Sequence, residues 1–396
     1  MDWRDRITFL NVRSFAWGAI RLYEVLEKLE ARGFGTLVIP SRGTFPFTGQ
    51  LFGIHQRWAE KRVFDNSVMH GLSTPFHASK ITLPFTADTQ LEDPSVGVSI
   101  SGQIRDYWVR VLKAILAGDL SSPELHFYQY VQDQIFGIGV GVGASIRRPS
   151  SHFVFVDTVV SGRAVVEIDR SMREQGLVNV HYVLIVDNDA KSLSAEYRHT
   201  IKGWEASGKA TLIPIENIFT EDRGPGLTGS WCLISPQLMS AGPTFLPGFS
   251  SSQVVGAAAG FIRVQYGSEL DNMNMTRTNG ALHFLLTALV SSELFQSQKG
   301  YAEYLYEDFI EELEAYSRSG FGPVDPRETL RIAKNAFGSK SSIAVMGRPI
   351  TAVEDVDVSA SHVIRVSFSE AEITRHVAAF KKLLSSGKQA FWYVHH

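Results

Sequence analysis

The chain lacks most of the features that mark a secreted or membrane-bound protein. It contains one cysteine, Cys232, in 396 residues, so it can form neither an internal disulfide nor a cysteine-based zinc site. The first residues are charged and have no apolar core of the kind found in signal peptides. No run reaches the roughly 20 apolar residues that a membrane span requires. These absences predict a cytoplasmic protein, in a reducing compartment, with no membrane partner.

The chain also lacks an excess of charge of one sign. Its 38 Lys and Arg residues and 41 Asp and Glu residues give a formal net charge of -3. A nucleic-acid partner is therefore not indicated, because such proteins usually carry a strong basic field. Hydrophobic residues make up 44% of the chain, which is ordinary for a globular protein and enough for a large core. The length favours more than one domain.

The regular pattern that is present is an alternation of apolar strand-like runs with amphipathic helices. The expected strands are residues 36–40, 152–156, 178–186 and 210–215. The expected helices are 16–32, 163–175 and 194–208, and another is expected to begin within 45–54. Strands that alternate with helices predict an α/β fold, in which a parallel sheet has helices on both faces.

Two parts of the chain depart from this alternation. Residues 55–134 contain strand-like runs and helices in no regular order, and we expect them to form an insertion or cap. The expected elements there are strands at 80–85 and 96–100 and helices at 103–116 and 122–134. A glycine-alternating strand follows at 135–146, and it fits either close packing against another backbone or a hairpin beside a ligand.

The last third of the chain is expected to be a mainly helical α+β region. A Pro-, Gly- and Ser-rich stretch at 235–252 precedes it. The expected elements are helices at 280–295, 301–317 and 327–337, a strand at 363–368 and a helix from 369 to 384. The aromatic and acidic helix at 301–317 fits packing with a solvated acidic face or a subunit interface. The sequence thus predicts a core from 1–54 and 135–234, an insertion at 55–134 and a C-terminal region at 235–396.

The first candidate site is the loop Ser41-Arg42-Gly43-Thr44, directly after an expected strand. Arg42 can neutralise a diphosphate and bind it through two hydrogen bonds. Gly43 permits unusual backbone angles and close approach of a ligand. An ordinary turn between a strand and a helix explains the same residues.

The second candidate site is the loop that runs from Asp157 to Arg163. Asp157 closes an expected strand and can accept hydrogen bonds from sugar hydroxyls or hold Mg²⁺ through water. Ser161 and Gly162 directly precede an expected helix, whose N-terminus favours a phosphate group. A helix start with a tight turn is the alternative explanation.

Taken together, the two loops resemble those of the type I phosphoribosyltransferase family over residues 15–54 and 136–234. The resemblance implies that Ser41, Arg42, Gly43 and Thr44 bind pyrophosphate. It implies that Asp157, Thr158, Val159, Val160, Ser161, Gly162 and Arg163 bind the ribose 5-phosphate part of phosphoribosyl pyrophosphate (PRPP). Arg42 and Asp157 would take part in catalysis, and Asp157 would contact the Mg²⁺ carried by PRPP.

Three positions depart from the family pattern. Val156 stands where the first of two acids is expected, Val160 where several members keep an aspartate, and Ala164 where a final hydroxyl is expected. Two hypotheses remain open. The chain transfers the phosphoribosyl group to a nitrogen acceptor with release of pyrophosphate. Alternatively, it is a non-catalytic PRPP or nucleotide sensor, or a structural protein, that acts through a protein partner or homo-oligomer by means of its C-terminal region.

Overall fold

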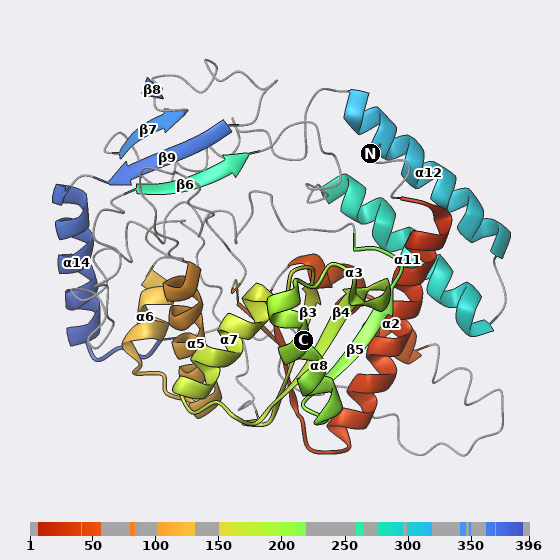
Figure 1. Cartoon of the computed structure of the whole chain (residues 1–396). Helices are drawn as coiled ribbons and strands as arrows, with labels where there is room; N and C mark the ends of the chain where they lie inside the picture. Colours follow the sequence, from red (N-terminus) through yellow and green to blue (C-terminus); the bar gives the residue numbers. More distant parts are fainter. Residues whose placement is uncertain are drawn as a thin grey trace.

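A computed structural model describes most of the chain (Figure 1). The described residues are 7–40, 42–56, 80–83, 85, 101–130, 150–218, 259–264, 276–295, 299–318, 341–345, 348–349, 362–368 and 370–390. Four predicted segments lie outside these residues, namely the strand at 96–100, the glycine-rich run at 135–146, the stretch at 235–252 and the helix at 327–337.

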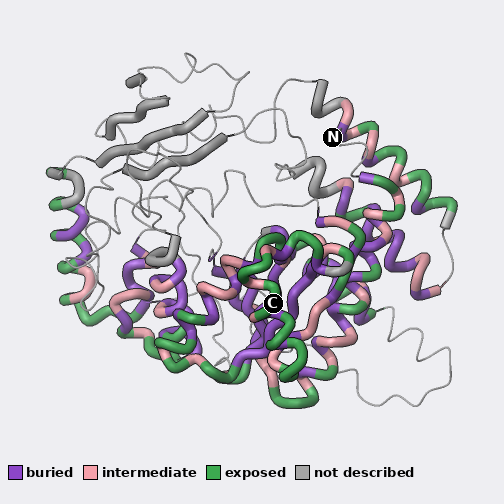
Figure 2. The backbone as a smooth tube through the Cα atoms, in the orientation of Figure 1, coloured by how far each residue is buried: buried purple, intermediate pink, exposed green. Residues whose placement is uncertain are grey.

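The centre of the fold is a five-stranded sheet with strand order β2-β1-β3-β4-β5. Its strands are β1 (Thr36–Ile39), β2 (Lys80–Thr82), β3 (Phe153–Val159), β4 (Val180–Asp187) and β5 (Ala210–Ile215). Every neighbouring pair is parallel. The longer strands are almost entirely buried (Figure 2), as expected for a sheet covered on both faces. The predicted α/β class with a parallel sheet is confirmed.

One face of the sheet is covered by α5 (Ser101–Ala117), α7 (Arg163–Glu174) and α8 (Ala195–Ala206). Trp108, Ile168 and Ile201 on these helices are fully buried, in one cluster with Phe155 and Tyr182 of the strands. The predicted insertion therefore contributes a helix that packs directly on the sheet, beside α7 (Figure 1).

The opposite face is covered by α2 (Phe9–Glu30), α3 (Phe45–Thr48) and α11 (Thr276–Phe295). Val154, Val156 and Val183 of the strands are fully buried there, in one cluster with Phe15 and Leu285 of the helices. The helix α12 (Lys299–Arg318) packs against α11. The C-terminal helices thus belong to the same hydrophobic layer as α2, while the boundary expected at residue 234 stays a prediction.

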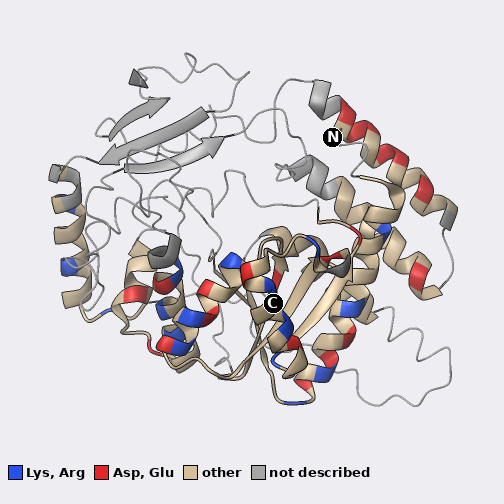
Figure 3. Ribbon diagram, in the orientation of Figure 1, with Lys and Arg blue, Asp and Glu red and all other residues tan. Residues whose placement is uncertain are grey.

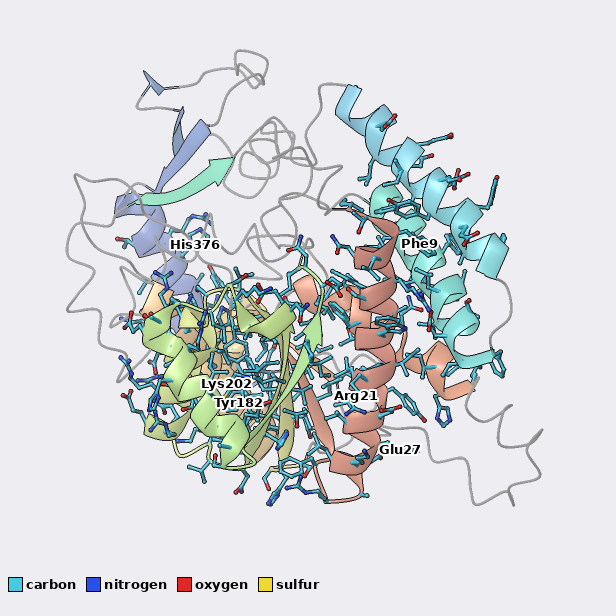
Figure 4. All side chains as sticks on the ribbon, turned by 45° about the vertical axis from the view of Figure 1, so that its right-hand side comes forward. Phe9, Arg21, Glu27, Tyr182, Lys202 and His376 are labelled. Carbon is cyan, nitrogen blue, oxygen red and sulfur yellow. The ribbon has the colours of Figure 1, made fainter. Side chains whose placement is uncertain are left out.

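The helix α2 begins seven residues before the predicted start at residue 16, with Thr8 as its N-cap. The Thr8 hydroxyl accepts a hydrogen bond from the backbone N–H of Asn11, at 3.2 Å. Phe9 packs edge-on against Tyr306 of α12, with ring centroids 5.3 Å apart (Figure 4). A contact with a residue 297 positions later in the chain stabilises this first turn, and local sequence patterns cannot show it.

The helix α12 has the predicted solvated acidic face. Figure 3 shows acidic residues along its outer side. Glu303, Glu307 and Asp308 are exposed, whereas Phe309 and Leu313 are buried against the neighbouring helix. This is the division expected of an amphipathic surface helix.

A second, four-stranded antiparallel sheet has the order β6-β9-β7-β8. Its strands are β6 (Ala259–Val264), β7 (Ser341–Val345), β8 (Arg348–Pro349) and β9 (His362–Phe368). Only β9 was expected from the sequence. The helix α14 (Glu370–Ser385) follows β9 and packs against α6 (Pro123–Tyr130) of the insertion.

A buried carboxylate joins α7 to the sheet near the amino ends of the strands. Asp169 of α7 is 1% exposed and accepts a hydrogen bond from the Tyr182 hydroxyl, at 2.9 Å. Lys209, just before β5, donates to the same carboxylate oxygen at 2.5 Å. Arg173 lies 3.0 Å from the other oxygen. These cations compensate the buried charge.

A buried histidine lies near the same end of the sheet. His181 of β4 is 4% exposed, and its Nε2 atom lies 2.9 Å from the Thr211 hydroxyl. Burial, with a smaller effect of Arg32, lowers the pKa of His181 to about 4. The ring is therefore neutral near pH 7, and its protonation opposes folding.

Candidate functional site

The two predicted loops meet at the point where the winding of the sheet reverses. The strand β1 lies between β2 and β3, so the chain leaves β1 towards one edge of the sheet and leaves β3 towards the other. The connection after β1 passes through α3, whereas that after β3 passes through α7 on the opposite face. In open α/β sheets, ligands bind at the carboxyl ends of the strands at such a switch point.

The first loop forms a tight turn at this point. Residues Arg42–Thr44 form a 3₁₀ turn, η1, that contacts β3. Gly43 and Thr44 are buried, and the Thr44 carbonyl accepts a hydrogen bond from the Thr48 hydroxyl at 3.1 Å. Ser41 and the side chain of Arg42 lie outside the described residues. The structure thus brings the backbone of this loop beside the second candidate site.

The second loop is shorter than the sequence predicted. The strand β3 continues to Val159, so Asp157, Thr158 and Val159 are strand residues that pair with β4. The apolar run of β4 extends equally far, and its backbone supplies the hydrogen bonds that keep these three residues in the sheet. The turn itself contains Val160, Ser161 and Gly162.

Asp157 is nearly completely buried, at 3% exposed. It alternates along β3 with Phe155 and Val159, so its side chain lies on the face covered by α5, α7 and α8. A ligand that reaches this carboxylate has to enter the layer between the strand ends and these helices. The prediction that Asp157 lies on an open loop is wrong, because this residue belongs to β3 and pairs with β4.

Gly162 has a structural role that needs no ligand. It is the N-cap of α7 and has φ of +88°, a conformation that strongly favours glycine. A Cβ atom at this position would lie 2.8 Å from Ile201 Cδ1 and 3.0 Å from Tyr197 Cβ, both on α8. The glycine is therefore required for the start of α7 to approach α8.

The start of α7 is locally electropositive. Its first turn contains Arg163 and no acidic residue, and the Arg163 backbone N–H lies 3.4 Å from the Ser161 hydroxyl oxygen. The helix dipole adds partial positive charge at this end. Ser161 is exposed, and its hydroxyl lies beside the first backbone N–H of the helix, directly before the half-buried Arg163 and Ala164. This is an arrangement that accommodates an anion.

An ion-pair chain connects this helix start to the insertion. Arg163 Nε lies 3.8 Å from one carboxylate oxygen of Glu167, and the Arg163 side chain is 40% exposed. The other oxygen of Glu167 pairs with Arg105 of α5, whose side chain is only 3% exposed. Glu167 thus compensates a buried arginine, and α5 and α7 are fixed relative to each other at the candidate site.

The loop after β4 forms a neighbouring wall, and the sequence allowed two interpretations of residues 187–189, a ligand contact from the neighbouring strand end or an ordinary turn. The Ser161 carbonyl accepts hydrogen bonds from the backbone N–H of Ser194 at 3.1 Å and from its hydroxyl at 3.2 Å. Asp187 accepts from the Ser192 backbone N–H at 2.9 Å and from its hydroxyl at 2.5 Å. Asp187 therefore stabilises its own turn, η3 (Asn188–Ala190), in agreement with the interpretation of these residues as a turn.

The two valines that depart from the family pattern have different environments. Val156 is fully buried on the face covered by α2, opposite to Asp157. An acid at that position would lie in an apolar core. Val160 is 37% exposed in the turn.

The carboxylates of the described residues do not form a dedicated metal centre. No group of three or more His, Cys, Asp or Glu side chains comes together among them. Magnesium commonly keeps several waters and binds one or two carboxylates together with substrate phosphates. The single Asp157 fits that mode, in which the ligand supplies most of the coordination.

The comparisons with known proteins do not assign a function to the chain, so a functional proposal depends on the two loops. No family model matches the chain, and neither curated proteins nor solved structures give a match. Within the part of the chain that the structure describes, no helix has the length and apolar character needed to cross a membrane.

Proposed function

We propose that the chain binds Mg²⁺-PRPP or a related nucleotide at the switch point between β1 and β3, in a fold of the type I phosphoribosyltransferase kind. The observation that carries the proposal is the parallel pairing of β1 with β3, together with the contact of η1 with β3, the strand that leads into the turn before α7. One loop then serves the pyrophosphate, and the other serves the ribose 5-phosphate. The exposed Ser161 and the electropositive start of α7 support this division.

In the catalytic form of the proposal, a nitrogen nucleophile displaces pyrophosphate from the anomeric carbon of the ribose. The new C–N bond forms as the C–O bond breaks, its electron pair leaves with pyrophosphate, and the nitrogen loses its proton to solvent. Arg42 stabilises the charge that develops on the leaving group. Asp157 holds the ribose hydroxyls, while Ser161 and the backbone of residues 159–162 hold the 5-phosphate in place. Magnesium supplies further charge neutralisation when bound with PRPP.

A non-catalytic sensor is the second candidate, and the environment of Val156 favours it. Because that side chain packs in the core, a second carboxylate is absent at the strand end, and the site has one fewer ligand for the ribose and metal. Val160 offers no group that could accept a proton from the nucleophile. Both candidates share the binding step and differ in whether pyrophosphate is released.

Calorimetric titration with two fragments of PRPP tests the loops separately. Ribose 5-phosphate should bind the turn at Ser161, and pyrophosphate should bind the loop at Arg42. We expect Ser161→Ala to weaken ribose 5-phosphate binding by about tenfold, the typical effect of one lost hydrogen bond to a charged group, and to leave pyrophosphate binding unchanged. Arg42→Ala should give the opposite pattern. Ser207→Ala, at the far end of α8, is the matched control.

Two outcomes decide between the candidates. If the wild-type chain binds neither fragment nor Mg²⁺-PRPP, the proposed site is wrong. If it binds PRPP but releases no pyrophosphate with any of a panel of nucleobases, the sensor replaces the enzyme as the better description.

A further inference from the structure

The outer side of α12 carries charge of one sign. Residues 301–314 of this helix include six acidic side chains and no Lys, Arg or His. The acids that are exposed, called here the acidic face (Figure 3), are Glu303, Glu307, Asp308 and Glu311. Tyr301 and Tyr304 of the same helix are 56% and 63% exposed. Because Tyr304 lies one helical turn before Glu307 and Asp308, aromatic and acidic groups share this surface.

The outer side of α14 carries the opposite charge (Figure 3). Residues 374–390 include four Lys and Arg side chains and no Asp or Glu. All four are exposed and are called here the basic face, namely Arg375, Lys381, Lys382 and Lys388. Arg375 and Lys382 are about two helical turns apart and therefore lie on the same side of α14. Ala378 and Ala379, which are exposed between them, have side chains too small to shield the charges.

The acidic face and the basic face lie on opposite sides of the molecule. The helix α14 packs against α6, α6 packs against α5, and α5 covers one face of the central sheet with α7 and α8. The helix α12 packs against α11, which covers the other face of the sheet with α2. The two outer helices are far apart in both orientations (Figures 1 and 4). A contact between the two faces therefore requires two copies of the chain.

We propose that the acidic face of one chain docks on the basic face of a second copy of the same chain. The stretch from Glu303 to Glu311 is about 12 Å long, at a rise of about 1.5 Å per residue. By the same measure, the stretch from Arg375 to Lys382 is about 10 Å long. The two rows of opposite charge therefore match in length. Carboxylates accept hydrogen bonds from guanidinium and ammonium groups, and exposed tyrosine rings attract the same cations.

This contact joins the copies head to tail. Each chain offers its acidic face to one neighbour and its basic face to another, which is a heterologous interface. Because the faces lie on opposite sides of the fold, a pair of chains leaves one face of each kind open, and further copies can add. Exposed ion pairs are individually weak and are screened by salt, so assembly requires high protein concentration and low ionic strength. Assembly of this kind requires no ligand at the strand ends.

Sedimentation velocity of the full chain at two salt concentrations gives the first test. At about 0.05 M salt, we expect the weight-average sedimentation coefficient to rise with protein concentration beyond the value of a dimer. At about 0.5 M salt, the association constant should be lower by about tenfold or more, because the Debye length falls from about 14 Å to about 4 Å.

Two paired charge reversals, both at exposed positions, test the two faces separately. We expect Glu307→Lys with Asp308→Lys to weaken self-association by about tenfold or more, because like charges then meet at the interface. Lys381→Glu with Lys382→Glu should have the same effect. A mixture of the two variants should associate again, and so should a chain with all four substitutions, because opposite charges face each other once more.

A matched control separates the two faces from the net charge of the chain. Lys28→Glu with Arg170→Glu changes exposed residues of α2 and α7 and alters the net charge as much as the reversal on α14. Association should stay unchanged in this control. Three results would overturn the proposal. They are a wild-type chain that stays monomeric or stops at a dimer at low salt, a control that weakens association as much as the reversal on α14, and reversals that the mixture does not restore.

Discussion

The substitution Gly162→Ala tests whether the glycine before α7 serves the fold, the ligand or both. Two costs follow from the structure. Alanine at φ of +88° costs about 1 to 2 kcal/mol relative to glycine. The new Cβ atom would also lie 2.8 Å from Ile201 Cδ1 and 3.0 Å from Tyr197 Cβ, an overpacking that typically costs about 1 to 3 kcal/mol. We expect a total loss of about 2 to 5 kcal/mol in the free energy of unfolding.

Urea unfolding, followed by circular dichroism, measures this loss, and a double-mutant cycle separates its two parts. Ile201→Val removes the Cδ1 atom that the new methyl group would meet, while the backbone cost and the contact with Tyr197 remain. We therefore expect the two substitutions together to be less harmful than the sum of their separate effects, by about 1 kcal/mol. An unchanged urea midpoint in Gly162→Ala would refute the reasoning, since the turn would then not be packed as described. Strict additivity would refute the role assigned to Ile201.

Three further predictions concern buried polar groups and the two valines. Asp169→Asn should lower the free energy of unfolding by about 2 to 3 kcal/mol, because Lys209 loses its charged partner. In the same background, Lys209→Met should restore part of this free energy, and urea unfolding measures both changes. The pKa of His181, held at about 4, lies below its unfolded value, so the unfolded chain binds more protons between about pH 6.5 and pH 4. The free energy of unfolding should therefore be highest above pH 6.5 and should fall by at most about 3 kcal/mol as the pH drops towards 4. His181→Gln should flatten this part of the profile of unfolding free energy against pH. An equally steep profile in the variant would assign the effect to other groups. Val156→Asp should lower the free energy of unfolding by about 3 kcal/mol or more, because it buries an unpaired carboxylate. Val160→Asp should change the thermal midpoint little, since that position is 37% exposed. Equal effects would contradict the buried position of Val156 and the exposed position of Val160.

The strands and helices of the core could be predicted because their signals are local. The runs at 178–186 and 210–215 are apolar enough to identify buried strands, and the alternation with helices predicts parallel pairing. The sequence does not contain the order of the strands in any local pattern. That β1 lies between β2 and β3 depends on packing across the whole sheet.

The missed features share a dependence on distant partners. The first turn of α2 is stabilised by the contact of Phe9 with Tyr306, and the turn at Ser161 is held by Ser194. The burial of Asp157 follows from its pairing in register with β4. Each is a tertiary interaction between segments that a sequence pattern treats separately.

The candidate site therefore contains two groups of residues, those whose identity is explained by packing and those that are accessible to a ligand. Gly162 and Val156 are explained by packing alone, because the first permits contact with α8 and the second fills the core beneath α2. Gly162 therefore cannot count for or against a phosphate ligand, whereas the buried Val156 removes one possible carboxylate ligand for the ribose and metal. Ser161 and Arg163 differ from them in exposure, because Ser161 is exposed and the Arg163 side chain is 40% exposed at the start of α7. Both also have partners within the fold, since the Ser161 hydroxyl accepts the Arg163 backbone N–H and Arg163 pairs with Glu167. The binding experiment on Ser161 is consequently a sharper test of function than any substitution of the glycine, whose effect on stability would mask its effect on a ligand.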